Sequence, residues 1–408
     1  MYTTALSAVR RRWHIGIPIV AIAFLASALS IGSSNYTFGF FVEPLEADFG
    51  WSRTAIGGAL SFAAIGSLTT PILGRIMDTK GAKPVLVFSL TVLAISFLVR
   101  PLMTELWHFY ALSVVQFIFF AGANTLPAGR LVGIWFPHKR GRVMGIVMMG
   151  NNFGGLTISL MTGYFIAIGG WASAYVATGV LALGITLLAF FIVHERIAAD
   201  QSKGVNLNKE LPGFSVREAL RTNTFYIMTV ALAFGSFTYS ILLPHISVHL
   251  LDEGTSNKAM VTLASLLAAF GMGGKLAFGY LADRYSARQA MILSLAGQIV
   301  FITLIAYFPT GNQIWIVVPL FGFFFGAFGV LGTLLVQECF GLRYFGSISG
   351  ISGIIGIIPT VTGPLIAGTS SDTLGSYAPA FVFTGFTFVL AIGLLGILKH
   401  PDLKNAKN

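Results

Sequence analysis

The chain has 408 residues, of which 55% are hydrophobic and only 10% are charged, and it carries a formal net charge of +10. Because soluble globular proteins contain about 25% charged residues, this composition excludes an ordinary water-soluble fold. The basic residues lie in short segments between long apolar stretches rather than along one face, which excludes a protein that binds nucleic acid.

Twelve apolar stretches follow one another along the chain, each of about 20 residues or more, the length that crosses a hydrocarbon core as a helix. The first continues past Phe41, which is too long for the apolar part of a cleaved signal peptide. A polar segment separates the sixth stretch from the seventh, and its end, Ser215 to Leu220, is expected to form a short surface helix. The predicted spans are 14–42, 53–77, 82–103, 107–136, 142–168, 172–194, 223–250, 258–282, 287–308, 313–338, 344–371 and 377–398.

The distribution of Lys and Arg predicts the orientation of these spans. With the N-terminus inside, twenty of the 25 basic residues fall on the cytoplasmic side, and only Arg53, Arg100 and Lys258 fall outside. Since cytoplasmic loops carry an excess of basic residues, both termini are expected in the cytoplasm. The sequence thus predicts an all-α membrane protein of twelve transmembrane helices in two six-helix bundles. The predicted parts are 1–194 for the first bundle, 195–221 for a cytoplasmic linker and 222–408 for the second bundle.

A short motif occurs twice, after the second and after the eighth span. It consists of glycine, three further residues, aspartate and then basic residues, and its two copies begin 205 residues apart, about half of the chain. Glycine lets two helices approach closely, and the aspartate can accept hydrogen bonds from the N-terminus of a neighbouring helix or pair with arginine. The motif residues are Gly74, Arg75, Asp78 and Gly81 in the first copy and Gly279, Asp283 and Arg284 in the second.

Two basic residues, Arg130 and Lys275, fall within spans, whereas all fifteen acidic residues lie outside the spans or at their ends. A charge in the middle of a span costs about 2.5–3.5 kcal/mol on insertion scales. Lys275 lies about 12 Å along its helix from Asp283, so an anionic substrate is its natural counter-ion. The alternative is that Lys275 reaches the cytoplasmic surface or pairs with backbone carbonyls. Arg130 either lines an inner vestibule that attracts anions or ties helices together.

Several polar or aromatic side chains within the spans are candidates for a substrate pocket. Such groups need partners in hydrocarbon, so they face the bundle interior or a cavity, and helix–helix hydrogen bonds are the alternative role. His245 and His249 share one helical face, where they form a proton relay, bind a metal with a ligand not identified by sequence, or have no role. The candidates are Ser34, Asn35 and Tyr36 in the first span, Asn124 in the fourth, Asn151 and Asn152 in the fifth, and Tyr239 and His245 in the seventh.

The two motif loops resemble the signature loop of the major facilitator superfamily, and the plan of six spans plus six matches that family. This resemblance implies two pseudo-symmetric bundles, the major facilitator fold, with the two loops acting as gates. A narrower resemblance is to the branch of monocarboxylate porters and oxalate–formate antiporters. It rests on Trp135-Phe136-Pro137-His138-Lys139-Arg140-Gly141 after the fourth span, and on Asn35-Tyr36 followed by Glu43-Pro44 in the first.

The narrower resemblance implies roles for three further positions. Lys275 stands where that branch usually has an arginine that binds the substrate carboxylate, and lysine keeps the charge but loses the bidentate fork. Ser352 stands where the oxalate branch has a second cation, which argues against a dicarboxylate such as oxalate. Phe325 stands at the position of an aromatic pocket wall in the oxalate branch, although core packing also accounts for it.

We therefore expect a secondary active transporter of a small organic anion, with a monocarboxylate first, that works by proton symport or anion exchange. The alternatives are a carrier of an uncharged or drug-like solute and a transporter-like membrane sensor or receptor. No phosphate-binding, zinc-protease or nucleophile-elbow motif occurs, and there is one cysteine, so we expect no enzyme activity, cofactor or metal. The expected partners are the anion, a proton and the lipid bilayer of a bacterial inner membrane, and the expected state is a monomer.

Overall fold

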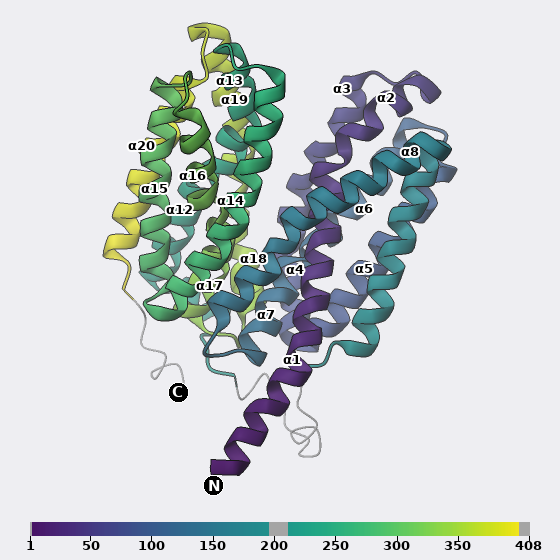
Figure 1. The fold of residues 1–408 in the computed structure, drawn as a ribbon. Coiled ribbons are helices and arrows are strands. Elements are labelled where there is room, and N and C mark those ends of the chain that lie inside the picture. Colours follow the sequence, from purple (N-terminus) through teal and green to yellow (C-terminus); the bar gives the residue numbers. More distant parts are fainter. Residues whose placement is uncertain (1, 196–210, 400–408) are drawn as a thin grey trace. The chain divides into compact units, whose positions relative to one another are not determined.

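The computed structural model describes residues 2–195 and 211–399, with side chains from Gly16 onward apart from Asn35. Most of the predicted linker, residues 196–210, lies outside the described part. Apart from one bridging pair of residues, the secondary structure that is described is helical (Figure 1). The predicted all-α fold class is confirmed.

Within the described residues, eleven helices are long and apolar enough to cross a membrane. The longest, α8 (Arg140–Ile192), has 53 residues, and its backbone leaves helical geometry at Gly169 and Gly170. Gly170 has a φ of 73°, in the left-handed region that favours glycine. Because this break divides α8 into two apolar segments, the eleven helices account for the twelve predicted spans.

Contacts between residues divide the chain into two compact units, which we describe separately. Unit 1 consists of Met1–Pro137, Ile146–Gly213 and Leu342–Gly350, and unit 2 of His138–Gly145, Phe214–Gly341 and Ile351–Asn408. Each unit thus holds most of one half of the chain together with a short segment from the other half. The domain boundaries at the linker stay a prediction.

The first half of the chain supplies the following helices, with short π or 3-10 segments labelled η: α1 (Tyr2–Ile31), η1 (Gly32–Tyr36), α2 (Phe38–Phe49), α3 (Arg53–Gly58), η2 (Ala59–Phe62), α4 (Ala63–Lys80), α5 (Ala82–Val99), η3 (Arg100–Leu102), α6 (Leu106–Phe120), η4 (Ala121–Ala123), α7 (Thr125–Trp135) and α8. The second half supplies α11 (Val216–Leu220), α12 (Asn223–Phe237), η5 (Thr238–Leu242), α13 (Leu243–Asp252), α14 (Asn257–Arg284), α15 (Ala287–Tyr307), α16 (Ile314–Gly326), α17 (Phe328–Phe340), α18 (Phe345–Ile355), α19 (Ile357–Leu374) and α20 (Ala378–Ile397).

Side-chain caps begin several of these helices. The hydroxyls of Ser52, Ser256 and Ser286 each accept a hydrogen bond from the backbone N–H three residues on, at the starts of α3, α14 and α15. The short helix predicted at the end of the linker is confirmed as α11. Its Ser215 and Glu218 form a reciprocal capping box, in which each side chain accepts from the other residue's backbone N–H.

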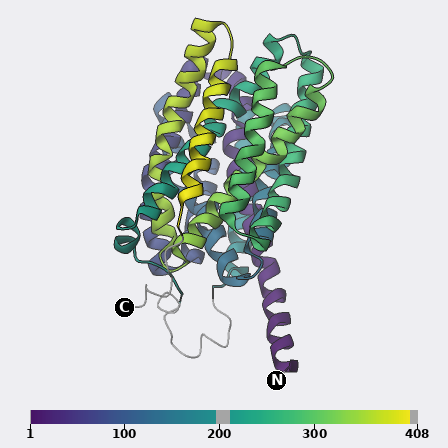
Figure 2. The same ribbon diagram turned by 90° about the vertical axis from the view of Figure 1, so that its left-hand side faces the viewer.

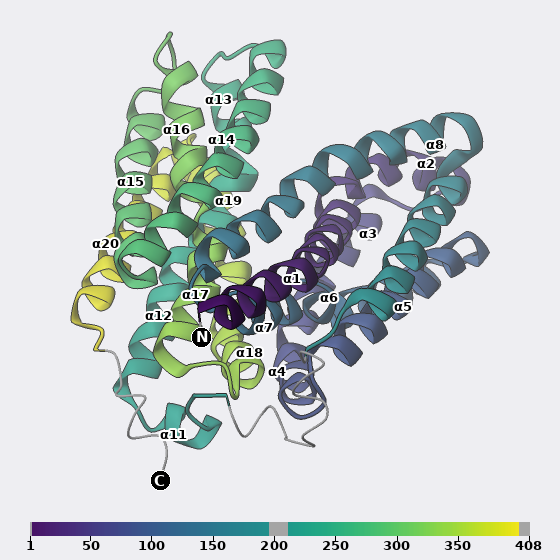
Figure 3. The same cartoon turned by 60° about the horizontal axis from the view of Figure 1, so that its bottom comes forward.

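Glycine allows close helix packing in unit 1. A Cβ at Gly154 in α8 would lie 2.0 Å from the carbonyl oxygen of Ala28 in α1, and one at Gly150 would lie 2.4 Å from that of Phe24. These two helices run side by side (Figure 3). Because no larger residue fits there, the glycines set the distance between α1 and α8.

In unit 2, glycines allow the same close packing between α14 and α16. A Cβ at Gly274 would lie 1.8 Å from the carbonyl oxygen of Phe323, and one at Gly326 would lie 2.2 Å from that of Gly271. The remaining helices of this unit include α12 and α15, which both pack against the yellow α20 (Figure 2). The contacts of Gly274 and Gly326 hold the backbone of α14 close to α16 at the position just before Lys275.

The first span of each half changes to π-helical geometry part-way along. These segments are η1, after α1, and η5, after α12. Single π turns occur frequently at functional sites, since the extra residue per turn redirects side chains. Of the residues predicted for a pocket, η1 holds Ser34, Asn35 and Tyr36, and η5 holds Tyr239.

Candidate functional site

The aspartates of the two motif copies both bind the N-terminus of a helix. In unit 1, the Asp78 carboxylate accepts the backbone N–H groups of Gly346 and Ser347, at 2.9 and 2.7 Å. In unit 2, the Asp283 carboxylate accepts those of Gly141 and Arg142, at 2.7 and 3.0 Å. A carboxylate is favoured there by the unpaired N–H groups and the positive end of the helix dipole. These are the hydrogen bonds that the motif predicts.

The motif glycines bring the same helices together. A Cβ at Gly74 would lie 2.1 Å from the carbonyl oxygen of Gly346, and one at Gly279 would lie 2.3 Å from that of Gly141. Gly81 has a φ of 100°, and a Cβ there would also lie 2.6 Å from the carboxylate of Glu195. The motif arginines Arg75 and Arg284 are exposed.

Arg130 is fully buried in unit 1 between two carboxylates. Its guanidinium lies 3.5 Å from Asp78 and 3.4 Å from Glu195, and it donates a hydrogen bond to the carbonyl oxygen of Leu342 at 3.5 Å. Glu195 also accepts the backbone N–H of Ala82 at the start of α5. These contacts join α4, α5 and α7 with the segment before α18, and they favour the helix-tying interpretation of Arg130 over the vestibule interpretation.

Lys275 lies in α14, in unit 2, and is only 8% exposed. Its position is held tightly, because a Cβ at Gly145 would lie 2.5 Å from the Lys275 carbonyl oxygen and Gly274 is pressed against Phe323. Lys275 is thus a buried cation on a closely packed stretch of α14.

Other predicted residues of unit 1 are spread over several surroundings. Tyr36 is 45% exposed, and its ring covers Gly155. Asn124 is buried at the junction of η4 and α7, and its side-chain oxygen has no hydrogen-bond partner among the described residues. Asn151 and Asn152 are half-buried in α8. The side chain of Asn35 lies outside the described residues.

In unit 2, two aromatic predictions meet. The rings of Tyr239 and Phe325 are 5.1 Å apart, which places Phe325 beside the π segment of the seventh span. Ser352 is buried and accepts a hydrogen bond from Thr229 at 3.0 Å. Ser352 thus lies in a neutral hydroxyl pair.

The two histidines of α13 have different partners. His245 stacks on Tyr377, with ring centroids 5.2 Å apart, and its Nδ1 lies 2.7 Å from the carbonyl oxygen of Ile241. His249 is buried, and its Nε2 lies 3.3 Å from the carbonyl oxygen of Ile305. Within the described residues, no three His, Cys, Asp or Glu side chains are grouped closely enough to hold a metal ion.

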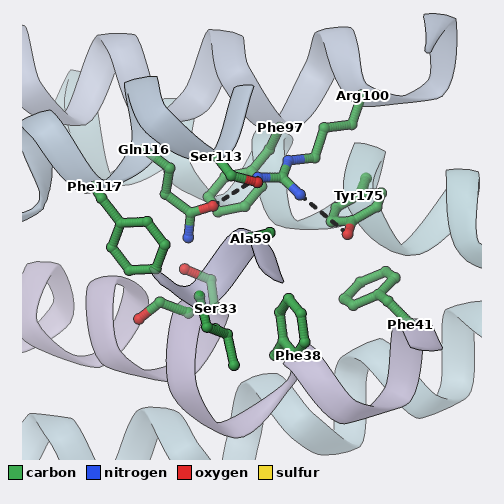
Figure 4. Close-up of a pocket in the computed structure, with 12 residues that line it drawn as sticks. Ser33, Phe38, Phe41, Ala59, Phe97, Arg100, Ser113, Gln116, Phe117 and Tyr175 are labelled. Carbon is green, nitrogen blue, oxygen red and sulfur yellow. Dashed lines mark hydrogen bonds between the residues drawn. The ribbon is translucent and has the colours of Figure 1, made fainter. Parts of the chain in front are cut away.

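Sequence reasoning missed one cation in unit 1. Arg100, counted above with the outer loop residues, is 4% exposed and lines a small, partly open pocket (Figure 4). The signal was present, because Arg100 falls within the apolar stretch 82–103, and Ser113 and Gln116 are three residues apart on the next span. The positive-inside count treats any basic residue near a span end as a loop residue.

The fold, the paired motif loops and the buried cations agree with a family match across most of the chain. The model of the Major Facilitator Superfamily matches residues 23–358. The chain belongs to the major facilitator superfamily. As the sequence predicts, it is a membrane transporter by family and fold, and it is not an enzyme.

Curated relatives within the superfamily are similar over much of their length. Monocarboxylate transporter 13 of Bos taurus is 25% identical, over 94% of this chain and 89% of the relative. The probable galactarate/D-glucarate transporter GarP of Escherichia coli K12 is 24% identical, over 96% and 97%. Monocarboxylate transporter 12 of Homo sapiens is 24% identical over 72% of this chain, which spans 63% of that relative, less than two thirds of its length.

Solved structures of the superfamily share the fold. The proton:xylose symporter XylE bound to 6-bromo-6-deoxy-D-glucose superposes with a TM-score of 0.74 at 13% identity, over 96% of this chain and 98% of that one. The human organic anion transporter MFSD10 superposes with a TM-score of 0.71 at 15% identity, over 93% and 99%. At these identities the likeness shows the fold alone.

Proposed function

We propose that this protein is a secondary active transporter of a small organic anion, with a monocarboxylate as the substrate class. The observation that carries the proposal is Lys275, a cation that is 8% exposed within a 28-residue apolar helix. A cation buried among apolar helices attracts a negatively charged group strongly, because the low local dielectric strengthens the interaction.

Two further observations support the substrate class. The relatives named for monocarboxylates and for galactarate and D-glucarate are all named for carboxylates. Ser352, at the position where a second cation would bind a second carboxylate, is a neutral residue paired with Thr229. Lys275 is the one buried Lys or Arg among the described residues of unit 2, which favours a single negative charge on the substrate, and sugar diacids are the second candidate.

For the mechanism, we propose that the halves of the chain rock about the substrate and expose it to each side in turn. The two motif loops are the proposed gates, since Asp78 and Asp283 hold the N-termini of α18 and α8 through hydrogen bonds that can break and reform. The coupling ion is either a proton, carried by the substrate or by His245, or a counter-anion in exchange.

The orientation and the membrane are part of the same proposal. Both termini would face the cytoplasm, as the basic residues predict, and a bacterial inner membrane is the proposed location. The predicted substrate pocket is proposed to include Lys275, Tyr239, Phe325 and Ser352.

The test is uptake into proteoliposomes of labelled L-lactate, formate, benzoate and galactarate, with glucose as the uncharged comparison. We expect uptake of at least one carboxylate, lowered about tenfold or more by Lys275→Ala and partly kept by Lys275→Arg, because one charge-assisted contact to a buried group supplies roughly 1.5–3 kcal/mol. Lys258→Ala is the matched control, since Lys258 is an exposed lysine on the same helix.

The alternatives predict different results. Undiminished carboxylate uptake by the Lys275→Ala protein contradicts the role given to Lys275. Uptake of glucose rather than of the acids favours a carrier of uncharged solutes, and carboxylate binding without uptake favours a sensor.

A further inference from the structure

Arg100 is a buried cation that the proposed substrate site in unit 2 does not use. It follows α5 and is surrounded by aromatic rings, with its guanidinium carbon 4.8 Å from the ring centre of Tyr175, 5.3 Å from that of Phe109 and 5.6 Å from that of Phe97. Within the described part of the chain, no carboxylate lies within 4.0 Å of it. Its charge is therefore stabilised by ring faces and neutral groups rather than by an ion pair.

The hydrogen bonds of Arg100 leave donors unused. A guanidinium has five N–H groups. Three hydrogen bonds are present, to Tyr175 at 3.2 Å, Ser113 at 3.4 Å and Gln116 at 2.7 Å. The Nε–H, which is buried, has no partner among the described residues. A buried cation with unused donors costs free energy unless an acceptor reaches it.

One neighbouring side chain, Gln116, adds hydrogen-bond donors to the pocket, whereas the hydroxyl protons of Ser33 and Ser34 are used within their own helix. The side-chain oxygen of Gln116 accepts from Arg100, so its NH₂ group points away from the guanidinium (Figure 4). Ser33 and Ser34 line the same pocket and come from η1, where the π turn brings two adjacent serines to it. Both serine hydroxyls donate to carbonyls one turn back in the chain, at 2.6 Å.

Aromatic walls limit the shape of what can enter. Phe41 stacks on Tyr175 with ring centroids 4.0 Å apart, and Phe38, Phe97 and Phe117 also line the pocket. Such a site, with one cation, one amide donor and apolar walls, matches a small anion that has an apolar side, as a carboxylate on a short carbon chain does.

We propose that the Arg100 pocket is a second anion site, which takes the carboxylate group of a small organic acid. The carboxylate class rests on the proposed function, whereas a site at Arg100 follows from unit 1 alone. Along α5, Arg100 is eighteen residues from Ala82, which contacts the Arg130 cluster, a distance of about 27 Å at 1.5 Å per residue. Arg100 is thus at the end of this helix opposite to the motif loop, the expected outer side.

A structural role of Arg100 is the competing explanation, because its contacts join α5, α6 and α8. That role lowers thermal stability when Arg100 is replaced, but it does not make stability or binding depend on an added anion. The experiment must therefore measure binding and not stability alone.

The probe is fluoroacetate, whose fluorine NMR line broadens when it binds weakly to purified protein in detergent. The measurement uses Lys275→Ala protein, which lacks the proposed unit 2 cation. We expect broadening to persist there and to fall about fivefold or more when Arg100→Gln is added, since a charge-assisted contact is lost. Arg53→Gln is the matched control, because Arg53 is an exposed arginine of the same unit that pairs with Glu46.

A second variant keeps the test informative if the Arg100→Gln protein does not fold. Gln116→Leu keeps the cation and removes the amide donor. We expect it to weaken binding only about threefold, because the lost hydrogen bond to the carboxylate is partly offset by the Arg100 N–H group that the substitution frees. Unchanged broadening in the Arg100→Gln protein overturns the site, as does an equal loss in the Arg53→Gln protein. If Arg100→Gln does not fold, unchanged binding in Gln116→Leu overturns it.

The source of the anion is decided by competition. Acetate that displaces fluoroacetate at a lower concentration than chloride does supports a carboxylate site, whereas equal displacement by chloride overturns that class. Lys275→Ala protein that still transports contradicts the proposed function and leaves this binding result unaffected, so the two failures are distinguishable.

Discussion

At the scale of single residues, Asp78 and Asp283 have the same place in the repeat but different surroundings. The Asp78 carboxylate is 1% exposed and lies beside the equally buried Arg130. Asp283 pairs with Arg142, whose side chain is 45% exposed, at 3.5 Å. Neutralising Asp78 leaves a buried arginine with one partner fewer, whereas neutralising Asp283 leaves Arg142, whose charge water compensates.

Asp78→Asn should therefore destabilise the protein more than Asp283→Asn. We expect about 3 kcal/mol for Asp78, because Arg130 keeps Glu195 as one partner, and about 1 kcal/mol for Asp283, where a helix cap is weakened. The measurement is the midpoint of thermal unfolding in one detergent, with the exposed Asp372→Asn as control. Equal shifts for the two variants would contradict the difference in burial.

Some contacts of these charged residues follow from the repeated motif and others do not. The hydrogen-bonding role of both aspartates was predicted from the glycine–aspartate spacing. The ion pair between Arg130 and Glu195 was not predicted, because the two residues are 65 positions apart. The burial of Arg100 was not predicted either, because it depends on neighbouring helices. A sequence pattern describes neighbours along the chain, and such contacts are not local.

At the scale of helices, glycine positions decide how closely neighbours approach. Gly274 and Gly273 are adjacent in α14, but a Cβ at Gly274 would lie 1.8 Å from a backbone carbonyl oxygen, and one at Gly273 would lie 3.9 Å from the nearest ring atom. Gly274 is therefore confined by backbone, whereas a Cβ at Gly273 would make only an ordinary van der Waals contact with a ring.

Gly274→Ala should loosen the contact between α14 and α16, and Gly273→Ala should not. Overpacking of this kind costs about 1–3 kcal/mol, so we expect a clearly lower thermal midpoint for Gly274→Ala alone. Carboxylate uptake should fall with it, since Lys275 follows directly in the chain. Two equally stable variants would show that the helices can separate without cost.

The break in α8 depends on another glycine. Gly170 has a φ of 73° and a ψ of −179°. A residue with a Cβ atom is strained in this conformation by about 1–3 kcal/mol. Gly170→Ala should lower the thermal midpoint, whereas Gly184→Ala, at an open position in the same helix, should not. An unchanged midpoint for Gly170→Ala would mean that the break between the two spans does not depend on this conformation.

At the scale of the whole molecule, the positive-inside prediction can be tested by labelling with a membrane-impermeant maleimide. The native Cys339 is buried, so it should not react. Asn312→Cys, at an exposed loop position expected outside, should react in intact cells, and Gln289→Cys, exposed near the start of α15, should react only in opened cells. The reverse pattern would place both termini outside.

Properties that are local or additive along the chain follow from the amino-acid sequence alone. Span number follows from the length of apolar stretches and was predicted correctly, and a repeated motif of a few residues predicts the plan of two halves. Lys275 was found in the same way, since a cation inside an apolar stretch is visible without any partner.

Which side chains contact one another across the fold depends on how the helices pack. Arg130 lies between Asp78 and Glu195, and Asp78 binds the N-terminus of α18, more than 260 residues later in the chain. Arg100, expected in a loop, is buried and lines a pocket. The physical reason is that these energies come from burial and from contacts between distant segments. Composition and spacing along the chain do not show which distant residues will be in contact once the helices have packed.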